Sequence, residues 1–353
     1  MIYIPIRTHI GDLPERHVLT QLYYDIINIS IFFIIMIIYN TKFDDKFIRN
    51  IIKILKITII IAVVISVAQV FNPDLFKSIV YRSEDIGGYS IYQIRRTSIF
   101  GYTPLDMGLS YIPLLSIAIG VIYFYKKKIP VLFLILGGIS ALLTNTRFII
   151  IAYFILCLQL FVVNRKKIKN IFKYTLTSMF LILLIMYIFS YIGYDFTDWY
   201  NVRLFAEGSI EETTRYKAIE NFLKFYPRYW LFGNGEFSSA EIKTASRAIG
   251  SSQIHVGYLA HLVSYGFIGS FFLYCFWFSL AKKLYKTAKQ TNYWGSFFAF
   301  LTFLWAQATL VHYSIFFYGL IFAFVFDKYF QDKHNQRMLY MEKNNRANSS
   351  KKK

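Results

Sequence analysis

Residues 57–70 read ITIIIAVVISVAQV and residues 180–189 read FLILLIMYIF, two long apolar runs. Neither run alternates apolar and polar residues, as the strands of a transmembrane barrel do. Similar runs of roughly 20 residues, long enough to cross a ~30 Å hydrocarbon core, recur along the chain and are separated by short charged segments. The pattern predicts an all-α fold, a polytopic transmembrane helix bundle.

The composition of the whole chain supports this prediction. Of 353 residues, 56% are hydrophobic and 20% aromatic, yet the formal net charge is +19. A water-soluble domain could not bury so much apolar surface while carrying that charge, so lipid is the expected solvent. The positive-inside rule accounts for the basic loops, and nucleic acid is not an expected partner. Residues 1–20 lack the apolar core of a signal peptide, so the first spanning helix is expected to direct insertion.

We expect about nine spanning helices in a single membrane domain at 1–330, followed by a polar, basic cytoplasmic tail at 331–353. The helices are expected near residues 20–39, 57–72, 105–125, 130–144, 146–163, 174–192, 256–280, 295–311 and 313–329. Alternate connections (40–56, 126–128, the connection that carries the cluster at 165–167 and extends to Lys173, 282–289 and the tail from Lys328) hold 25 of the 39 basic residues and are predicted to be cytoplasmic. The outer face then holds 73–104, a corner at 144–147 and the largest loop, 193–255.

The two kinds of basic residue are distributed differently. The predicted cytoplasmic segments hold 21 Lys and 4 Arg, whereas the outer segments hold 4 Lys and 10 Arg. A guanidinium matches phosphate oxygens in bidentate fashion and stays charged when partly desolvated, so the outer arginines suggest phosphate recognition near the membrane surface. The alternative is ion pairing with the eight acidic residues of the 193–255 loop.

The large outer loop contains a predicted amphipathic helix at 216–226 that is expected to lie in the membrane interface. Arg215 lies near its N-terminus. The loop continues into Gly233-Asn234-Gly235, where the glycines Gly233 and Gly235 allow a tight turn and a close approach of backbone to a ligand. A plain turn without a ligand is the alternative.

His255 ends the same loop, at the outer mouth of the next expected helix. An imidazole titrates near neutrality, so His255 is a candidate to accept a proton from a sugar hydroxyl, and a structural histidine is the alternative. His261 is expected to pack or to hydrogen-bond within the bundle. Neither a ligand-spaced His/Cys/carboxylate cluster nor a nucleotide-binding glycine motif is present, so no metal and no cofactor are expected.

Four segments occur in an order that resembles a known family. They are Arg95-Arg96 with the following residues to Pro104, the corner Thr144-Asn145-Thr146-Arg147, Arg215 with Phe232-Gly233-Asn234-Gly235, and His255 with Tyr258-Leu259, Gly266 and Gly269. Together they resemble the O-antigen polymerase and O-antigen ligase superfamily of bacterial membrane glycosyltransferases. Val256 departs from that pattern, because the family has Asn after the histidine.

The resemblance implies metal-independent transfer of a glycan from an undecaprenyl-diphosphate carrier in the bacterial cytoplasmic membrane. It implies that Arg147, Arg215 and one or both of Arg95 and Arg96 hold the diphosphate, and that His255 positions or deprotonates the acceptor. The expected partners are the lipid-linked oligosaccharide and membrane lipid, with a chain-length regulator and a flippase.

Polymerase and ligase differ in the acceptor. We favour a polymerase of capsular or O-antigen repeat units, since the Lys-, Ile- and Asn-rich composition suggests an AT-rich genome of an organism without a lipid A core. The non-enzymatic alternative is a polysaccharide transporter or flippase, which would need interrupted helices and charges near the membrane midplane. Only Asp25 and Asp106 are expected near span ends, which disfavours transport.

Overall fold

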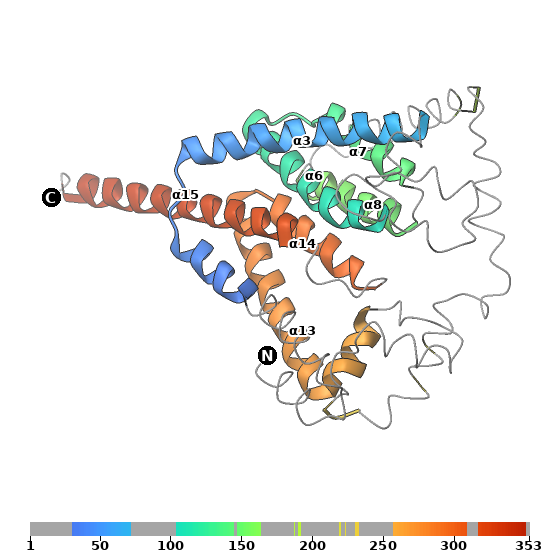
Figure 1. Cartoon of the computed structure of the whole chain (residues 1–353). Helices are drawn as coiled ribbons and strands as arrows, with labels where there is room; N and C mark the ends of the chain where they lie inside the picture. Colours follow the sequence, from blue (N-terminus) through green and yellow to red (C-terminus); the bar gives the residue numbers. More distant parts are fainter. Residues whose placement is uncertain are drawn as a thin grey trace.

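The computed structural model describes residues 30–71, 104–144, 147–163, 257–308 and 317–350, together with 187, 190–191, 219, 223 and 230–232. All regular secondary structure in these ranges is helical. After a helix at Ser30–Asn40 come α3 (Asp45–Phe71), α6 (Pro104–Lys126), α7 (Val131–Leu143), α8 (Arg147–Val163), α13 (Gly257–Thr291), α14 (Gly295–Ala306) and α15 (Phe317–Ser350). The all-helical prediction is therefore confirmed for the described part of the chain (Figure 1).

Two of the described helices are long and apolar enough to cross a membrane, at Asp45–Ala68 and Tyr265–Thr291. Five others are shorter apolar helices or helix portions of 10–17 residues. Eight of the nine expected spans coincide with a described helix, and the span at 174–192 lies almost wholly outside the described residues. The number of spans stays a prediction.

Helix α6 forms the centre of the bundle and packs against α3, α7, α8, α14 and α15 (Figure 1). Residues 111–122 of this helix are buried on every side, which is typical of a helix enclosed by others. Gly120 brings it against α14, because a Cβ at this position would lie 2.7 Å from the Gly295 Cα. Ser116 Oγ donates to the Gly295 carbonyl at 3.0 Å in the same contact. Small residues thus let two backbones touch, as is common between membrane helices.

Helix α3 begins at Asp45, so the prediction that residues 45–56 form a loop was wrong. Ile48, Ile51 and Leu55 of this segment are buried, whereas Lys46 and Arg49 are exposed. The spacing of the buried residues is that of one helix face. The charged residues of 45–56 do not mark the start of the helix; Lys46 and Arg49 lie on its exposed face.

Residues from several predicted cytoplasmic segments meet at one end of the bundle. Tyr329 Oη donates to Asp45 Oδ1 at 2.9 Å, Tyr125 Oη lies 3.1 Å from Tyr329 Oη, and Lys333 Nζ lies 3.0 Å from Asp45 Oδ1. These contacts join the start of α3, the end of α6 and the middle of α15. The predicted alternation of the loops and the side of the membrane that this end faces stay predictions.

A buried carboxylate lies at the same end and was overlooked in the sequence. Asp327, on α15, is 1% exposed and accepts a hydrogen bond from Tyr39 Oη at 2.8 Å. Lys283 Nζ lies 3.1 Å from the centroid of the Tyr39 ring. The expectation that only Asp25 and Asp106 lie near span ends therefore missed Asp327, which lies two residues before the end of the expected span at 313–329.

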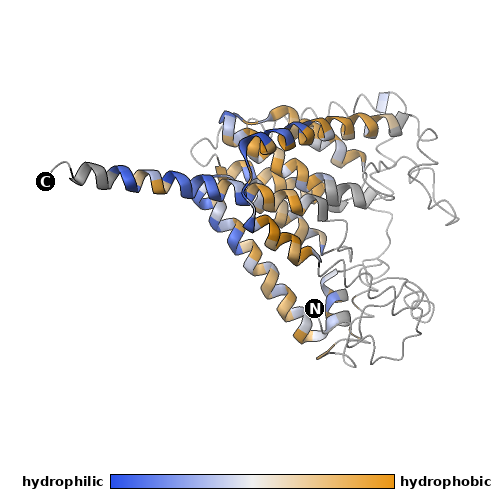
Figure 2. Cartoon of the chain, turned by 60° about the vertical axis from the view of Figure 1, so that its left-hand side comes forward, coloured by the Kyte–Doolittle hydropathy of each residue, from blue (hydrophilic) through white to orange (hydrophobic). Residues whose placement is uncertain are grey.

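Helix α15 continues to Ser350 and extends away from the bundle (Figure 1). Figure 2 shows that the extension is mostly hydrophilic, whereas the bundle is mostly hydrophobic. The expected polar tail at 331–353 is thus helical as far as its described residues reach.

Candidate functional site

Helix α13 is interrupted at Gly266, inside the segment that resembles the family pattern. Gly266 has φ 63° and ψ −174°, so residues 257–265 and 267–291 are two helical segments joined by a bend. This backbone conformation is open essentially to glycine alone. The backbone conformation at position 266 therefore explains why the first residue of the Gly266/Gly269 pair is a glycine.

The bend releases backbone donors that hold part of the large loop. In a continuous helix, the N–H groups of residues 267 and 268 would bond to carbonyls four residues earlier. Here Phe267 N–H donates to the Trp230 carbonyl at 2.7 Å, and Ile268 N–H donates to the Leu231 carbonyl at 3.2 Å. Residues 230–232 directly precede Gly233-Asn234-Gly235 in the sequence. The loop that carries the two predicted binding glycines is thus attached to the bend of α13.

Close packing explains why residue 269 is a glycine. A Cβ at this position would lie 2.8 Å from the Tyr265 Cβ, closer than real Cβ contacts. The missing side chain lets the second segment of α13 pass close to Tyr265, the last residue before the bend. Both glycines of the pair therefore shape the point where loop and helix meet.

His261 is completely buried on the first segment of α13. Its Nε2 lies 3.2 Å from Gln307 Oε1, and its ring stacks on Tyr265 with centroids 5.8 Å apart. Tyr274 and Trp277 contact the same ring edge-on. The prediction that His261 packs and hydrogen-bonds within the bundle is confirmed.

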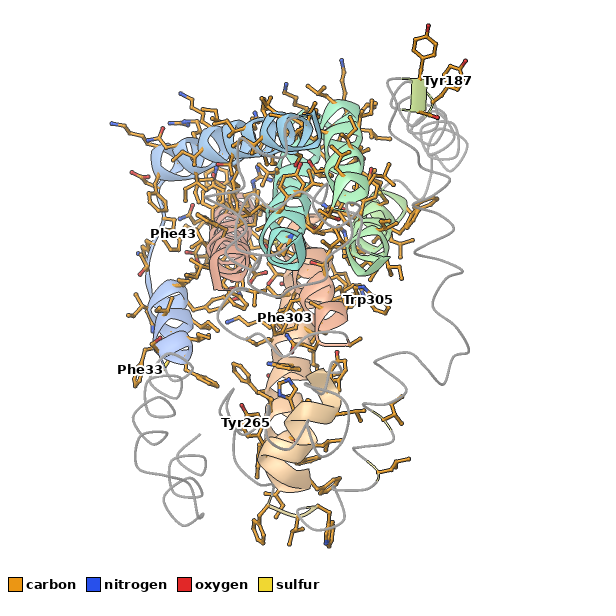
Figure 3. All side chains as sticks on the ribbon, turned by 45° about the vertical axis from the view of Figure 1, so that its right-hand side comes forward. Phe33, Phe43, Tyr187, Tyr265, Phe303 and Trp305 are labelled. Carbon is orange, nitrogen blue, oxygen red and sulfur yellow. The ribbon has the colours of Figure 1, made fainter. Side chains whose placement is uncertain are left out.

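The first turn of α13 is fastened to the end of α14 by further hydrogen bonds. Tyr258 N–H donates to the Gln307 carbonyl at 3.2 Å, and Tyr258 Oη donates to the Leu304 carbonyl at 2.6 Å. Tyr274 Oη donates to the Tyr258 carbonyl at 2.9 Å. In Figure 3, Tyr265 marks α13 near the place where α14, marked by Phe303 and Trp305, ends.

Most of the predicted site residues lie outside the described residues: Arg95, Arg96, Arg215, Gly233, Gly235 and His255. Arg147 is the first residue of α8 and follows the corner after α7, although only its backbone is described. His255 lies two residues before α13, and Gly233 directly follows Phe232. Within the described ranges, no group of three His, Cys, Asp or Glu residues is arranged to hold a metal ion.

Only two residues of the predicted interfacial helix at 216–226 are described. Ile219 and Leu223 are both helical, and they are 45% and 66% exposed. Their spacing puts them on one helix face, as the amphipathic prediction requires. The extent of this helix stays a prediction.

Sequence reasoning missed two contributors to this region. Gln307 is a polar residue near the end of an otherwise apolar predicted span, which is a signal for function or packing in a membrane helix. The carbonyls of Trp230 and Leu231 left no such signal, because every residue carries a carbonyl.

The described residues form a bundle of apolar helices, two of them long and apolar enough to cross a membrane, and residues 230–231 of the long loop are bonded to the bent helix α13. Residues 132–274 match the O-antigen ligase family. The match covers 143 of the 353 residues and confirms the resemblance of this part of the chain to the O-antigen ligase and polymerase superfamily. No curated protein and no solved structure matches the chain significantly.

The bend at Gly266 leads to a prediction. Gly266→Ala should destabilise the protein by about 1–3 kcal/mol, because alanine is strained in this backbone conformation. It should also lower glycan transfer, since the bend presents the donors that hold residues 230–231. Thermal unfolding in detergent and product formation at equal protein level measure the two effects. Gly138→Ala, inside α7, is the matched control and should lower neither the unfolding temperature nor glycan transfer, because alanine favours a helix interior. Equal losses in the two variants would contradict the role of the bend.

Proposed function

We propose that this protein polymerises undecaprenyl-diphosphate-linked oligosaccharide repeat units into capsular or O-antigen polysaccharide at the outer face of the bacterial cytoplasmic membrane. The observation that carries the proposal is that the family match at 132–274 contains Arg147, Arg215, Gly233, Gly235 and His255 in the order of the family pattern. A flippase that delivers the repeat units and a chain-length regulator are the expected partners.

The structure supports the proposal through the bend of α13. The Gly-x-Gly stretch adjoins residues 230–232, which are bonded to the bend, and His255 adjoins the helix whose first turn is bonded to α14. Two segments that are about 20 residues apart in the sequence are thereby attached to one helix. Such attachment suits a site that must hold a donor and an acceptor together.

In the proposed reaction, a hydroxyl of the acceptor glycan attacks the anomeric carbon of the donor glycan. The new glycosidic bond forms while the bond from the anomeric carbon to the diphosphate oxygen breaks, and undecaprenyl diphosphate leaves. The hydroxyl proton passes to His255 or to water. Negative charge grows on the leaving diphosphate, where Arg147, Arg215 and Arg95 or Arg96 would stabilise it more strongly in the transition state than before. No metal takes part in this scheme.

Ligation is the second candidate, favoured by the description of the matching family as O-antigen ligase. A ligase would perform the same bond exchange with an acceptor other than a lipid-linked repeat unit. The arginines and His255 would keep their roles.

One experiment separates the candidates. Purified protein in lipid nanodiscs is supplied with lipid-linked single repeat units extracted from host cells that lack its gene, and the products are separated by length. A ladder of multiples without any added acceptor is the expected result. Product only after addition of a separate acceptor glycolipid would indicate ligation. Absence of product with either acceptor, from folded protein, would overturn the assignment as a glycan-transfer enzyme.

A further inference from the structure

A polar pair lies inside an otherwise aromatic region between α13 and α14. His261 and Gln307 are both completely buried, and Tyr265, Tyr274 and Trp277 surround the imidazole. Apolar side chains would fill the same space without desolvating two polar groups. Buried polar pairs of this kind fix one arrangement of the elements that carry them.

Gln307 contacts α13 through both its main chain and its side chain. Its carbonyl accepts from Tyr258 N–H, and its side-chain Oε1 faces His261 Nε2, three residues further along α13. The 3.2 Å contact implies that His261 carries a proton on Nε2 and donates it to the amide oxygen. Gln307 Nε2, by contrast, has no hydrogen-bond partner among the described residues. The amide is therefore held by its oxygen, and the pair joins the first α13 segment to the end of α14 beside the hydrogen bonds of Tyr258.

We propose that His261 and Gln307 are positioning residues for the glycan-transfer site. They fix residues 257–265 on the end of α14, and thereby fix where the chain enters α13 from His255. The bend at Gly266 holds residues 230–231 of the large loop, which precede Gly233-Asn234-Gly235 in the sequence. This inference rests on the proposed function and adds two residues that do not themselves touch substrate.

The family match ends at residue 274, so it contains His261 and not Gln307. One member of the pair therefore comes from outside the matched stretch. In this chain, α14 supplies the support on which the end of the matched stretch rests.

The test is a double-mutant cycle with His261→Phe, Gln307→Leu and the combination of both. Phenylalanine keeps a ring between Tyr265 and Trp277 but removes the N–H donor, and leucine removes the acceptor. Each single variant should lower kcat of folded protein about 10–100-fold, as small displacements of reacting groups do, while KM for the lipid-linked donor changes less than about twofold. The double variant should lose about as much kcat as one single variant, because each change breaks the same contact.

Hydrogen exchange supplies a measurement that needs no activity. Backbone amides of residues 257–265 should lose protection about tenfold in His261→Phe, whereas α6 should stay protected. Gln159→Leu is the matched control, because Gln159, on α8, is also an almost completely buried glutamine and contacts Ser116 of α6 rather than α13. It should lower the melting temperature and leave kcat of folded protein unchanged.

Three results decide the outcome. Unchanged kcat in His261→Phe and Gln307→Leu, with an active wild type, would overturn the positioning role whatever happens to stability. If the fold-loss of kcat in the double variant equals the product of the two single losses, the two residues act independently, and the proposal that they act as one pair is overturned. A wild type that makes neither polymer nor ligated product would instead refute the proposed function, and the exchange experiment would then still report whether the pair fixes residues 257–265.

Discussion

His255→Ala should insert and accumulate normally but leave single lipid-linked repeat units unpolymerised. A residue that takes or directs the proton of the attacking hydroxyl contributes about 10²–10⁴-fold in rate, and alanine can do neither. Polymer length and the amount of unreacted repeat unit, measured at equal protein level, check this. His334→Ala is the matched control, since His334 is a partly buried histidine on α15, next to Lys333, which pairs with Asp45 at the end of the bundle where α3 begins. Full-length polymer from His255→Ala would remove this residue from the site.

His255→Gln separates two roles of the histidine. Glutamine can hydrogen-bond an acceptor hydroxyl but cannot take its proton. Substantial activity would show that the residue orients the acceptor and that the proton leaves late or to water. Diphosphate is a good leaving group, so a strongly activated donor needs little help from a base, and this outcome is compatible with the proposed reaction.

The sequence predicted the helices well because each one is encoded by a long apolar run. It failed at helix ends, as α3 illustrates. The charged residues at 45–56 indicate a loop, although Ile48, Ile51 and Leu55 recur at helical spacing among them. Charge marks where the membrane ends, and a helix can continue past that point with its charges toward water. The same holds for α15, which stays helical through a polar segment up to Ser350.

The candidate site was less predictable for a different reason. Side-chain chemistry predicts His255 and the arginines as site residues, and the family pattern also includes Gly266 and Gly269. What joins loop and helix, however, is a pair of backbone hydrogen bonds from Phe267 and Ile268. Backbone donors and acceptors occur at every residue, so only the fold reveals which of them meet. The predicted roles of Arg95, Arg96, Arg215, Gly233, Gly235 and His255 stay predictions.

The two ends of the bundle differ in the chemistry of their basic residues. At the end where α3 begins, Lys333 pairs with Asp45 and Lys283 lies over the Tyr39 ring, so some of these basic residues already have partners. The ten arginines of the predicted outer segments belong to other parts of the sequence, and their place on the outer face stays a prediction. Arg147, at the N-terminus of α8, also lies where unpaired backbone N–H groups favour an anion.

Arg147→Lys and Arg215→Lys should each lower glycan transfer strongly although the charge is conserved. Lysine cannot make the bidentate contact with phosphate oxygens that a guanidinium makes. Loss of one charge-assisted contact in the transition state costs about 2–4 kcal/mol, which is about 30–800-fold in rate. Arg49→Lys is the matched control, because Arg49 is an exposed arginine on α3.

The comparison also distinguishes phosphate binding from ion pairing. An arginine that only pairs with an acidic residue of the 193–255 loop can be replaced by lysine at a cost of about 0–1 kcal/mol, because exposed ion pairs depend little on the shape of the cation. Rates are measured with the purified protein at saturating and at limiting lipid-linked donor. If the guanidinium acts on the leaving diphosphate, its replacement by lysine should lower kcat as well as kcat/KM, because the lost contact is one that strengthens as charge develops. Near-normal polymer from both lysine variants would favour ion pairing and leave the diphosphate without its proposed ligands.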